Sequence, residues 1–124
     1  MSYEIPGFNR SYSTAGDLSA SWYKFVKLAG ATVVAVTGPT DDAIGVLQNK
    51  PAKAGAAATV QTTAVSRVFS GKALAAGVAV YLDATGAVTD VLSAGNCVGV
   101  TESAVTAAGL LVSVLLKPLG AVGA

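Results

Sequence analysis

Histidine is absent from the 124-residue sequence, and cysteine occurs only once, as Cys97. Without histidine the chain cannot build a Ser-His-Asp triad, a Cys-His pair or a histidine-containing metal site. A single thiol also excludes an intrachain disulfide and a metal site made of several cysteines. Cys97 lies in the strand-like run 96–100, where we expect it to act as a small buried hydrophobe rather than as a nucleophile.

Charged side chains are scarce as well. Eight Lys or Arg and seven Asp or Glu make up 12% of the chain and give a net charge of +1. The basic residues are scattered from Arg10 to Lys117 without a cluster, which disfavours binding to the phosphates of a nucleic acid. Apolar residues reach 52%, much of it Ala and Val. Because few charges solvate the surface, we expect a partner, including copies of the chain itself, to cover some of it.

Motifs that position reacting groups or phosphates are also missing. Asp41 and Asp42 are the only adjacent carboxylates, and they follow Gly38-Pro39, which is typical of a solvated turn rather than of an acid–base pair. Neither a phosphate-binding glycine-rich loop nor a dinucleotide-binding motif occurs. We therefore predict a protein that is not an enzyme and that binds no metal and no cofactor.

Hydrophobic runs are short. The longest uncharged apolar stretch, 103–116, is interrupted by Ser, Thr and Gly and is too short to span a bilayer. Residues 1–21 contain Glu4, Arg10 and Asp17 and lack the apolar centre of a signal peptide. We expect a protein that is made in the cytoplasm and is used there or carried out of the cell on a particle, with no membrane partner.

From Trp22 onward, short apolar runs separated by turn residues predict a mainly β fold. The expected strands cover 23–28, 32–37, 43–47 and 57–65, and the segment 38–42 has turn chemistry. A connector over 66–77 could hold one helical turn at 72–76. No stretch has the apolar spacing of a long helix, so at most one or two short helical turns are expected.

The chain repeats itself at an offset of 54 residues, which places Val26 on Val80. Gly45 and Gly99 then coincide inside strand patterns, where each predicts a bulge or a close approach of two backbones. A second pair of glycines precedes the last strand of each unit, at 55 and 109, and predicts turns with positive φ.

The domain organisation follows from this repeat. Residues 22–124 are predicted to form a single β domain made of two four-strand units, at about 22–66 and 77–119. Neither unit could bury its apolar face alone. Packed together, the two units are expected to form a small β-barrel or sandwich of about eight strands.

Residues 1–21 are predicted to form an extended N-terminal arm outside the packed domain. The segment is polar, shows no strand or helix period and has no matching segment before the second unit. Aromatic side chains are uncommon in tails that stay disordered, so we expect the arm to order on a partner. The side chains expected to bind that partner are Tyr3, Ile5, Phe8 and Tyr12.

Trp22, Tyr23 and Phe25 form an aromatic cluster where the arm joins the domain. The cluster could anchor an interface, since aromatic residues concentrate binding energy, or it could plug one end of the core. Strand alternation would place Tyr23 and Phe25 on one face and Trp22 on the other, toward a neighbouring molecule. Trp22 is therefore a further candidate for partner binding.

An ordered series of short motifs over residues 15–117 resembles the head decoration (capsid cement) proteins of tailed bacteriophages. The series consists of Ala15-Gly16-Asp17, Ile44-Gly45-Val46, Ala75-Ala76-Gly77 followed by Val80-Tyr81, Thr85-Gly86-Ala87-Val88 and Val98-Gly99-Val100. The resemblance implies a β-rich, β-tulip-like domain that assembles as a homotrimer. It further implies that trimers sit at three-fold and quasi-three-fold positions on the outer capsid surface, bind the major capsid protein, in part through an N-terminal arm, and stabilise the expanded shell.

Two other classes of function compete with a structural virion protein. A small β-barrel module that recognises a sugar or a peptide would fit the size of the chain. A sugar site usually combines exposed aromatics with Asp, Asn or Arg, yet after Phe25 only Phe69 and Tyr81 remain. An enzyme would need a proton-transfer or nucleophilic group of residues, and the sequence contains none that we can identify.

Overall fold

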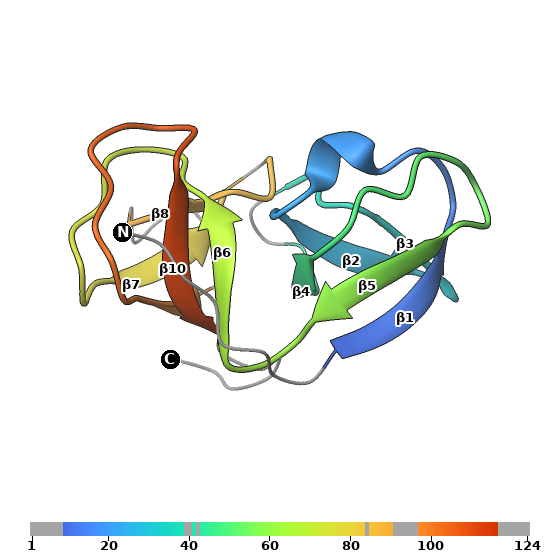
Figure 1. Cartoon of the computed structure of the whole chain (residues 1–124), viewed down its shortest axis with the longest axis horizontal. Helices are drawn as coiled ribbons and strands as arrows, with labels where there is room; N and C mark the ends of the chain where they lie inside the picture. Colours follow the sequence, from blue (N-terminus) through green and yellow to red (C-terminus); the bar gives the residue numbers. More distant parts are fainter. Residues whose placement is uncertain (1–8, 39–40, 42, 84, 91–96, 117–124) are drawn as a thin grey trace.

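The computed structural model describes residues 9–38, 41, 43–83, 85–90 and 97–116 (Figure 1). Within them the fold is mainly β, and the one helical element is the short 3-10 helix η1 (Ser19–Ser21), which confirms the predicted fold class. The strands are β1 (Asn9–Thr14), β2 (Phe25–Ala29), β3 (Thr32–Ala35), β4 (Ala43–Leu47), β5 (Ala57–Gln61), β6 (Val65–Phe69), β7 (Ala79–Leu82), β8 (Val88–Thr89), β9 (Cys97–Thr101) and β10 (Leu111–Leu116).

The strands form two units that lie side by side along the long axis of the molecule (Figure 1). The N-terminal unit, β1–β5, is a closed barrel of order β1-β3-β2-β4-β5, in which β1 and β3 are parallel and the other pairs are antiparallel. The C-terminal unit, β6–β10, is a five-stranded sheet of order β6-β10-β9-β7-β8. An isolated parallel bridge between Ser70 and Val88 joins its two ends, so this unit repeats the barrel with a weaker seam.

The repeat seen in the sequence is a structural repeat. The same irregularity interrupts the pairing of β2 with β4 after Val26 and the pairing of β7 with β9 after Val80. Gly45 in β4 and Gly99 in β9 are equivalent, because a Cβ on either would collide with a carbonyl oxygen of the next strand, β5 or β10. The predicted close approach of two backbones at these glycines is confirmed.

Each unit contains a fifth strand that the sequence analysis missed, β1 in one and β6 in the other. Thr14 ends β1 and Ser70 follows β6, and their carbonyl oxygens accept hydrogen bonds from the amides of Gly55 at 2.9 Å and Gly109 at 2.8 Å. Their hydroxyls donate to carbonyl oxygens in the loops before β5 and β10, at 2.8 and 3.0 Å. Both glycines have positive φ, +81° and +80°, as predicted. The four-strand units at 22–66 and 77–119 are therefore wrong.

An insertion hides the fifth strand from the sequence. Leu18 and Leu74 are equivalent, since both are buried and donate their amides to the loop that precedes the last strand, at Pro51 (2.8 Å) and Val105 (3.0 Å). Four residues separate Leu18 from Tyr23. In the C-terminal unit only two residues separate Leu74 from Gly77, which is the equivalent of Tyr23. Upstream of this insertion the offset between the units is two residues larger, so a comparison without gaps cannot align β1 with β6.

The prediction of an arm outside the packed domain is wrong for residues Asn9–Thr14. They form β1, which pairs with β5 along 9–13 and with β3 at its end, and so closes the barrel. The exposed Ser11 and Ser13 alternate with the half-buried Tyr12 and the buried Thr14. Main-chain pairing rather than a run of apolar side chains holds this strand, which is why its polar sequence resembles an arm.

Two apolar clusters stabilise the molecule, and one of them joins the units. The cluster inside the N-terminal unit consists of Leu18, Val26, Val33, Leu47, Ala58 and Val60. The larger cluster combines Tyr23, Phe25, Val36 and Val46 of the N-terminal unit with Val68, Leu74, Val80, Leu82, Val88, Val98, Val112, Val114 and Leu116 of the C-terminal unit. Because this core is shared, the two units form one packed body.

The connector between the predicted units also differs from expectation. The segment 66–77 contains most of β6, and 72–76 forms no helix. Leu74 instead forms an isolated antiparallel bridge with Val105, which keeps this segment extended. The expected strand over 57–65 is divided, because β5 ends at Gln61 and Ala64 turns the chain with a φ of 64° before β6.

Candidate functional site

The aromatic cluster lies at the boundary between the two units. Tyr23 is buried and packs in the shared core, and Trp22 is half-buried beside it, with ring centroids 4.4 Å apart and planes 28° apart. The Trp22 indole nitrogen donates to the Gln48 carbonyl oxygen at 3.3 Å, and Lys50 Nζ lies 4.3 Å from the ring centroid. Trp22 is thus held in one orientation by contacts within the chain.

The prediction that Trp22 points away from Tyr23 is wrong, since the two rings stack. Strand alternation does not apply there, because β2 begins only at Phe25 and Tyr23 has a left-handed backbone conformation with a φ of 57°. Trp22 packs against the shared core, as in the interpretation that the cluster plugs one end of it, and it keeps a partly exposed side.

Of the remaining candidates for partner binding, the structure describes only Tyr12, and it does not lie in an arm outside the domain. Tyr12 lies in β1, packs against the core of the N-terminal unit and carries the Arg10 guanidinium 5.6 Å from its ring centroid. Its ring therefore contributes to the wall of the barrel. Tyr3, Ile5 and Phe8 lie outside the described residues, and their role in partner binding stays a prediction.

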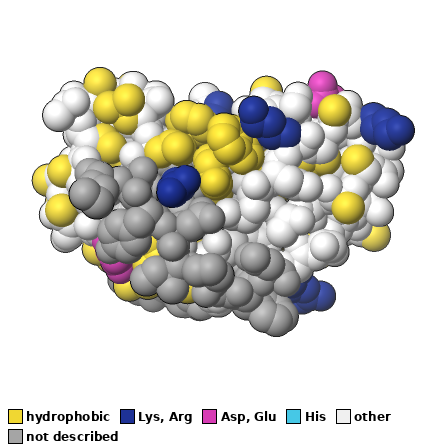
Figure 2. Space-filling model, in the orientation of Figure 1, with side chains coloured by type: hydrophobic (Ala, Val, Ile, Leu, Met, Phe, Trp, Pro, Cys, Tyr) yellow, Lys and Arg dark blue, Asp and Glu magenta, His cyan; other side chains and the backbone are white. Residues whose placement is uncertain are grey.

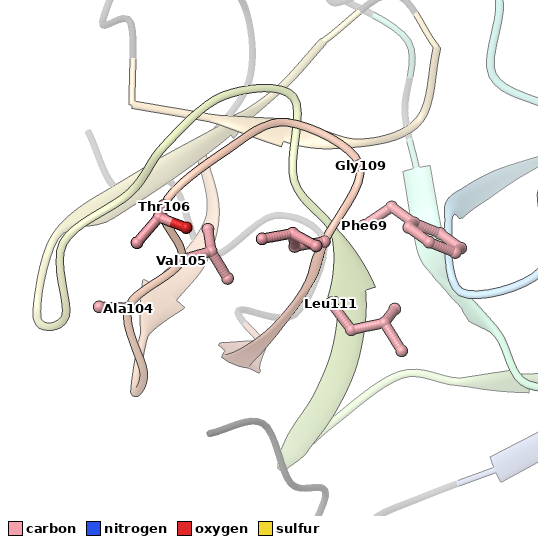
Figure 3. Close-up of a pocket in the computed structure, with 7 residues that line it drawn as sticks. Phe69, Ala104, Val105, Thr106, Gly109 and Leu111 are labelled. Carbon is pink, nitrogen blue, oxygen red and sulfur yellow. The ribbon is translucent and has the colours of Figure 1, made fainter.

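A shallow apolar hollow of about 510 Å³ opens beside β6 and β10 (Figure 3). Phe69 and Leu111 come from these strands, and the other residues come from the loop before β10; the lining consists of Phe69, Ala104, Val105, Thr106, Gly109, Leu110 and Leu111. No lining residue is charged, and Leu110 is 44% exposed. Hydrophobic side chains also gather between the two units on the face shown in Figure 2.

Sequence reasoning missed this hollow, although the repeat contains a signal for it. The positions equivalent to Leu110 and Leu111 in the N-terminal unit are Ala56 and Ala57, so the same loop and strand form there with small side chains. The barrel does not require large apolar residues at these places. An exposed Leu110 beside the half-buried Leu111, in one unit only, therefore indicates a surface feature that the barrel does not require.

The thiol of Cys97 and the carboxylate of Asp41 both make contacts within the chain. Cys97 is half-buried at the start of β9, where the equivalent residue is Ala43, and its Sγ lies 3.9 Å from the Gly99 carbonyl oxygen. Asp41 accepts hydrogen bonds from the amides of Thr37 at 2.9 Å and Gly38 at 3.0 Å. This confirms the solvated turn at Asp41, whereas Asp42 lies outside the described residues.

The electrostatics of this turn are local. The Thr37 amide, followed by the hydrogen bond from Lys27, lowers the pKa of Asp41 to about 2. Lys27 Nζ lies 3.0 Å from the Asp41 carboxylate. The turn between β3 and β4 is therefore tied to β2 by a charged side chain at its surface.

Among the residues that the structure describes, no group of three or more His, Cys, Asp and Glu side chains is arranged to hold a metal ion. Within the same residues, no helix has the length and apolarity needed to cross a membrane. No protein-family model matches the chain. A search of curated proteins gave no match either.

Proposed function

We propose that this chain is a structural virion protein that binds the outer surface of a phage capsid as trimers and stabilises the expanded shell. The observation that carries the proposal is where the motifs behind the resemblance lie in the fold. Ile44-Gly45-Val46 and Val98-Gly99-Val100 form equivalent positions of β4 and β9, where each glycine allows two strands to meet. The motifs are thus structural determinants of a duplicated barrel rather than chance strings of small residues.

The motif at Thr85–Val88 has a further structural role. Gly86 lies in the turn between β7 and β8, and its carbonyl oxygen accepts a hydrogen bond from the Phe25 amide of the other unit at 2.8 Å. A side chain on Gly86 would meet the Phe25 carbonyl oxygen at 2.9 Å. The resemblance therefore rests on residues that build each unit and on residues that join the two.

The construction of the molecule supports a mechanical role. The two units share one core, and β1, which follows the candidate side chains Tyr3, Ile5 and Phe8, is paired on both edges. Tension on the N-terminal segment would load the hydrogen bonds that join β1 to its neighbouring strands. Because these bonds lie perpendicular to β1, they would share the load and would not break one by one. A protein that ties neighbouring capsid subunits together needs such an anchored segment.

Binding to shells tests the proposal. The purified protein is mixed with expanded and with unexpanded shells of the phage that encodes it, and bound protein is separated by sedimentation. We expect saturable binding to expanded shells and a higher temperature of shell disruption once they are decorated. Equal failure to bind both kinds of shell, at concentrations that saturate known cement proteins, would contradict the proposal.

A further inference from the structure

The contact between the two units is one-sided. The turn between β7 and β8 of the C-terminal unit docks on the N-terminal unit, where Gly86 is buried against Lys24 and Phe25. Leu82, which begins this turn, is completely buried and belongs to the shared core. A hairpin turn of one unit thus acts as a plug, and the residues just before and at the start of β2 act as its receptor.

Among the residues that the structure describes, the equivalent hairpin of the N-terminal unit, β2–β3, makes no such contact. Near the end of β2 lies Leu28, the counterpart of Leu82, and 41% of Leu28 is exposed. The tip that follows, 29–31, is exposed throughout. This hairpin turns through Gly30, with a φ of +65°, and presents only small apolar groups beside the leucine.

The equivalent receptor on the C-terminal unit is also open. Val78 and Ala79 correspond to Lys24 and Phe25, and Ala79 is exposed while Val78 is half-buried. Thr101 holds this segment in place, because its hydroxyl donates to the Ala75 carbonyl oxygen at 2.7 Å and accepts from the Val78 amide at 3.1 Å. The receptor is therefore formed before any partner arrives, which lowers the entropic cost of binding.

The two open surfaces are the counterparts of the two sides of the contact within the chain, and they also match in chemistry. Residues 28–31 and 75–79 are all Ala, Gly, Val or Leu, so neither surface would bury a charge on contact. The nearest lysines in sequence are engaged elsewhere, Lys27 with Asp41 at 3.0 Å and Lys72 with Asp90 at 2.9 Å. Interfaces between copies of one chain have such apolar, charge-depleted centres.

We propose that a second copy of this chain occupies each surface. The β2–β3 hairpin of one copy docks on Val78 and Ala79 of the next, and so repeats between chains the contact that the β7–β8 turn makes within the chain. Such a head-to-tail contact uses different surfaces on its two sides, and it forms a closed ring of three copies when each copy is rotated by a third of a turn from the last. The proposal deepens the self-association in the proposed function and rests on it: three copies would form a ring of six similar units.

Two substitutions test the contact from its two sides. Leu28→Asp places a carboxylate on the hairpin, and Ala79→Lys places a cation on the receptor. Each is expected to weaken association of the full-length protein about 100-fold or more, since each removes apolar burial and introduces a charge that the contact would desolvate. Leu110→Asp is the matched control, because Leu110 is 44% exposed but lies in the loop before β10, beside Phe69, and it is expected to leave association unchanged.

The double variant provides the specific test. Leu28→Asp and Ala79→Lys on one chain place an Asp opposite a Lys at every contact of the ring, so the double variant should associate more tightly than either single variant. Sedimentation velocity gives the assembly state, and circular dichroism with thermal melting checks that each variant folds. We expect a trimer for the unmodified chain and monomers for the single variants at the same concentration.

Several results would overturn this contact. They are an unmodified chain that is monomeric or dimeric at every concentration, single variants that assemble as the unmodified chain does, or a double variant weaker than both. Shell binding is measured separately, as described above. An unmodified chain that does not self-associate but still binds shells would refute the head-to-tail contact and leave shell binding standing. Trimers that fail to bind shells would refute shell binding and leave the contact standing.

Discussion

Tyr23 occupies the position in the N-terminal unit that Gly77 occupies in the C-terminal unit, and both have left-handed backbones, with φ of 57° and 77°. Both donate their amides to the end of an equivalent strand, Tyr23 to Leu47 and Gly77 to Thr101, each at 2.9 Å. A bulky residue in this conformation is strained, and glycine is not. The strain at Tyr23 is tolerated because its ring is buried in the core shared by the units.

This relationship predicts a loss of stability at both positions, but from different causes. Tyr23→Gly should relieve the backbone but lose a buried ring, with a net loss of about 2–4 kcal/mol in the free energy of unfolding. Gly77→Ala should cost about 1–2 kcal/mol through the backbone alone, because nothing lies within 4 Å of its added Cβ. Urea denaturation measures both; a stabilising Tyr23→Gly would show that the ring contributes little.

The glycines inside the strands should tolerate no side chain. We expect Gly45→Ala and Gly99→Ala each to lower the free energy of unfolding by about 2 kcal/mol or more, since two paired strands must separate to make room. Gly16→Ala is the control, because Gly16 has ordinary φ and open space around it. If all three variants melted alike, the close approach of the strands would be wrong.

Two deletions separate the barrel strand from the segment before it. Deleting residues 2–17 removes β1 and should abolish cooperative unfolding, contrary to what an arm outside the domain would predict. Deleting residues 2–8 keeps β1 and should leave the thermal midpoint unchanged. The shorter deletion should still weaken binding to expanded shells about tenfold or more, through loss of Tyr3, Ile5 and Phe8.

The low pKa of Asp41 predicts a pH dependence of stability. A carboxylate whose pKa is about 2 when folded, against an ordinary value of 3.8, stabilises the fold above pH 3.8 and loses that contribution as the pH falls through about 2. Asp41→Asn should therefore lower the urea midpoint at pH 7, and this difference from the unmodified chain should shrink as the pH falls from 3.8 and disappear below pH 2. A constant difference between the two proteins across this range would contradict the assignment.

The features that the sequence predicted are those in which backbone geometry dictates the residue. Gly45 and Gly99 stand where two strands approach too closely for a Cβ, and Gly55 and Gly109 stand where a positive φ favours glycine. The β class followed from short apolar runs between turns. The repeat offset held from β2 to β5, where no insertion intervenes.

The features that the sequence concealed depend on contacts distant along the chain. β1 is polar because main-chain pairing with β3 and β5 holds it, and no local pattern reveals such pairing. The stacking of Trp22 on Tyr23 depends on where β2 begins. The hollow beside Leu110 depends on the approach of Phe69 to the loop before β10, about 40 residues further along the chain.

Electron cryo-microscopy of expanded shells, incubated with the full-length protein and compared with bare shells, tests the central claim most directly. The account predicts added density outside the capsid at three-fold and quasi-three-fold positions, into which three copies of the two-unit body fit. Shells whose outer surface is the same with and without the protein would contradict it, as would density at other positions.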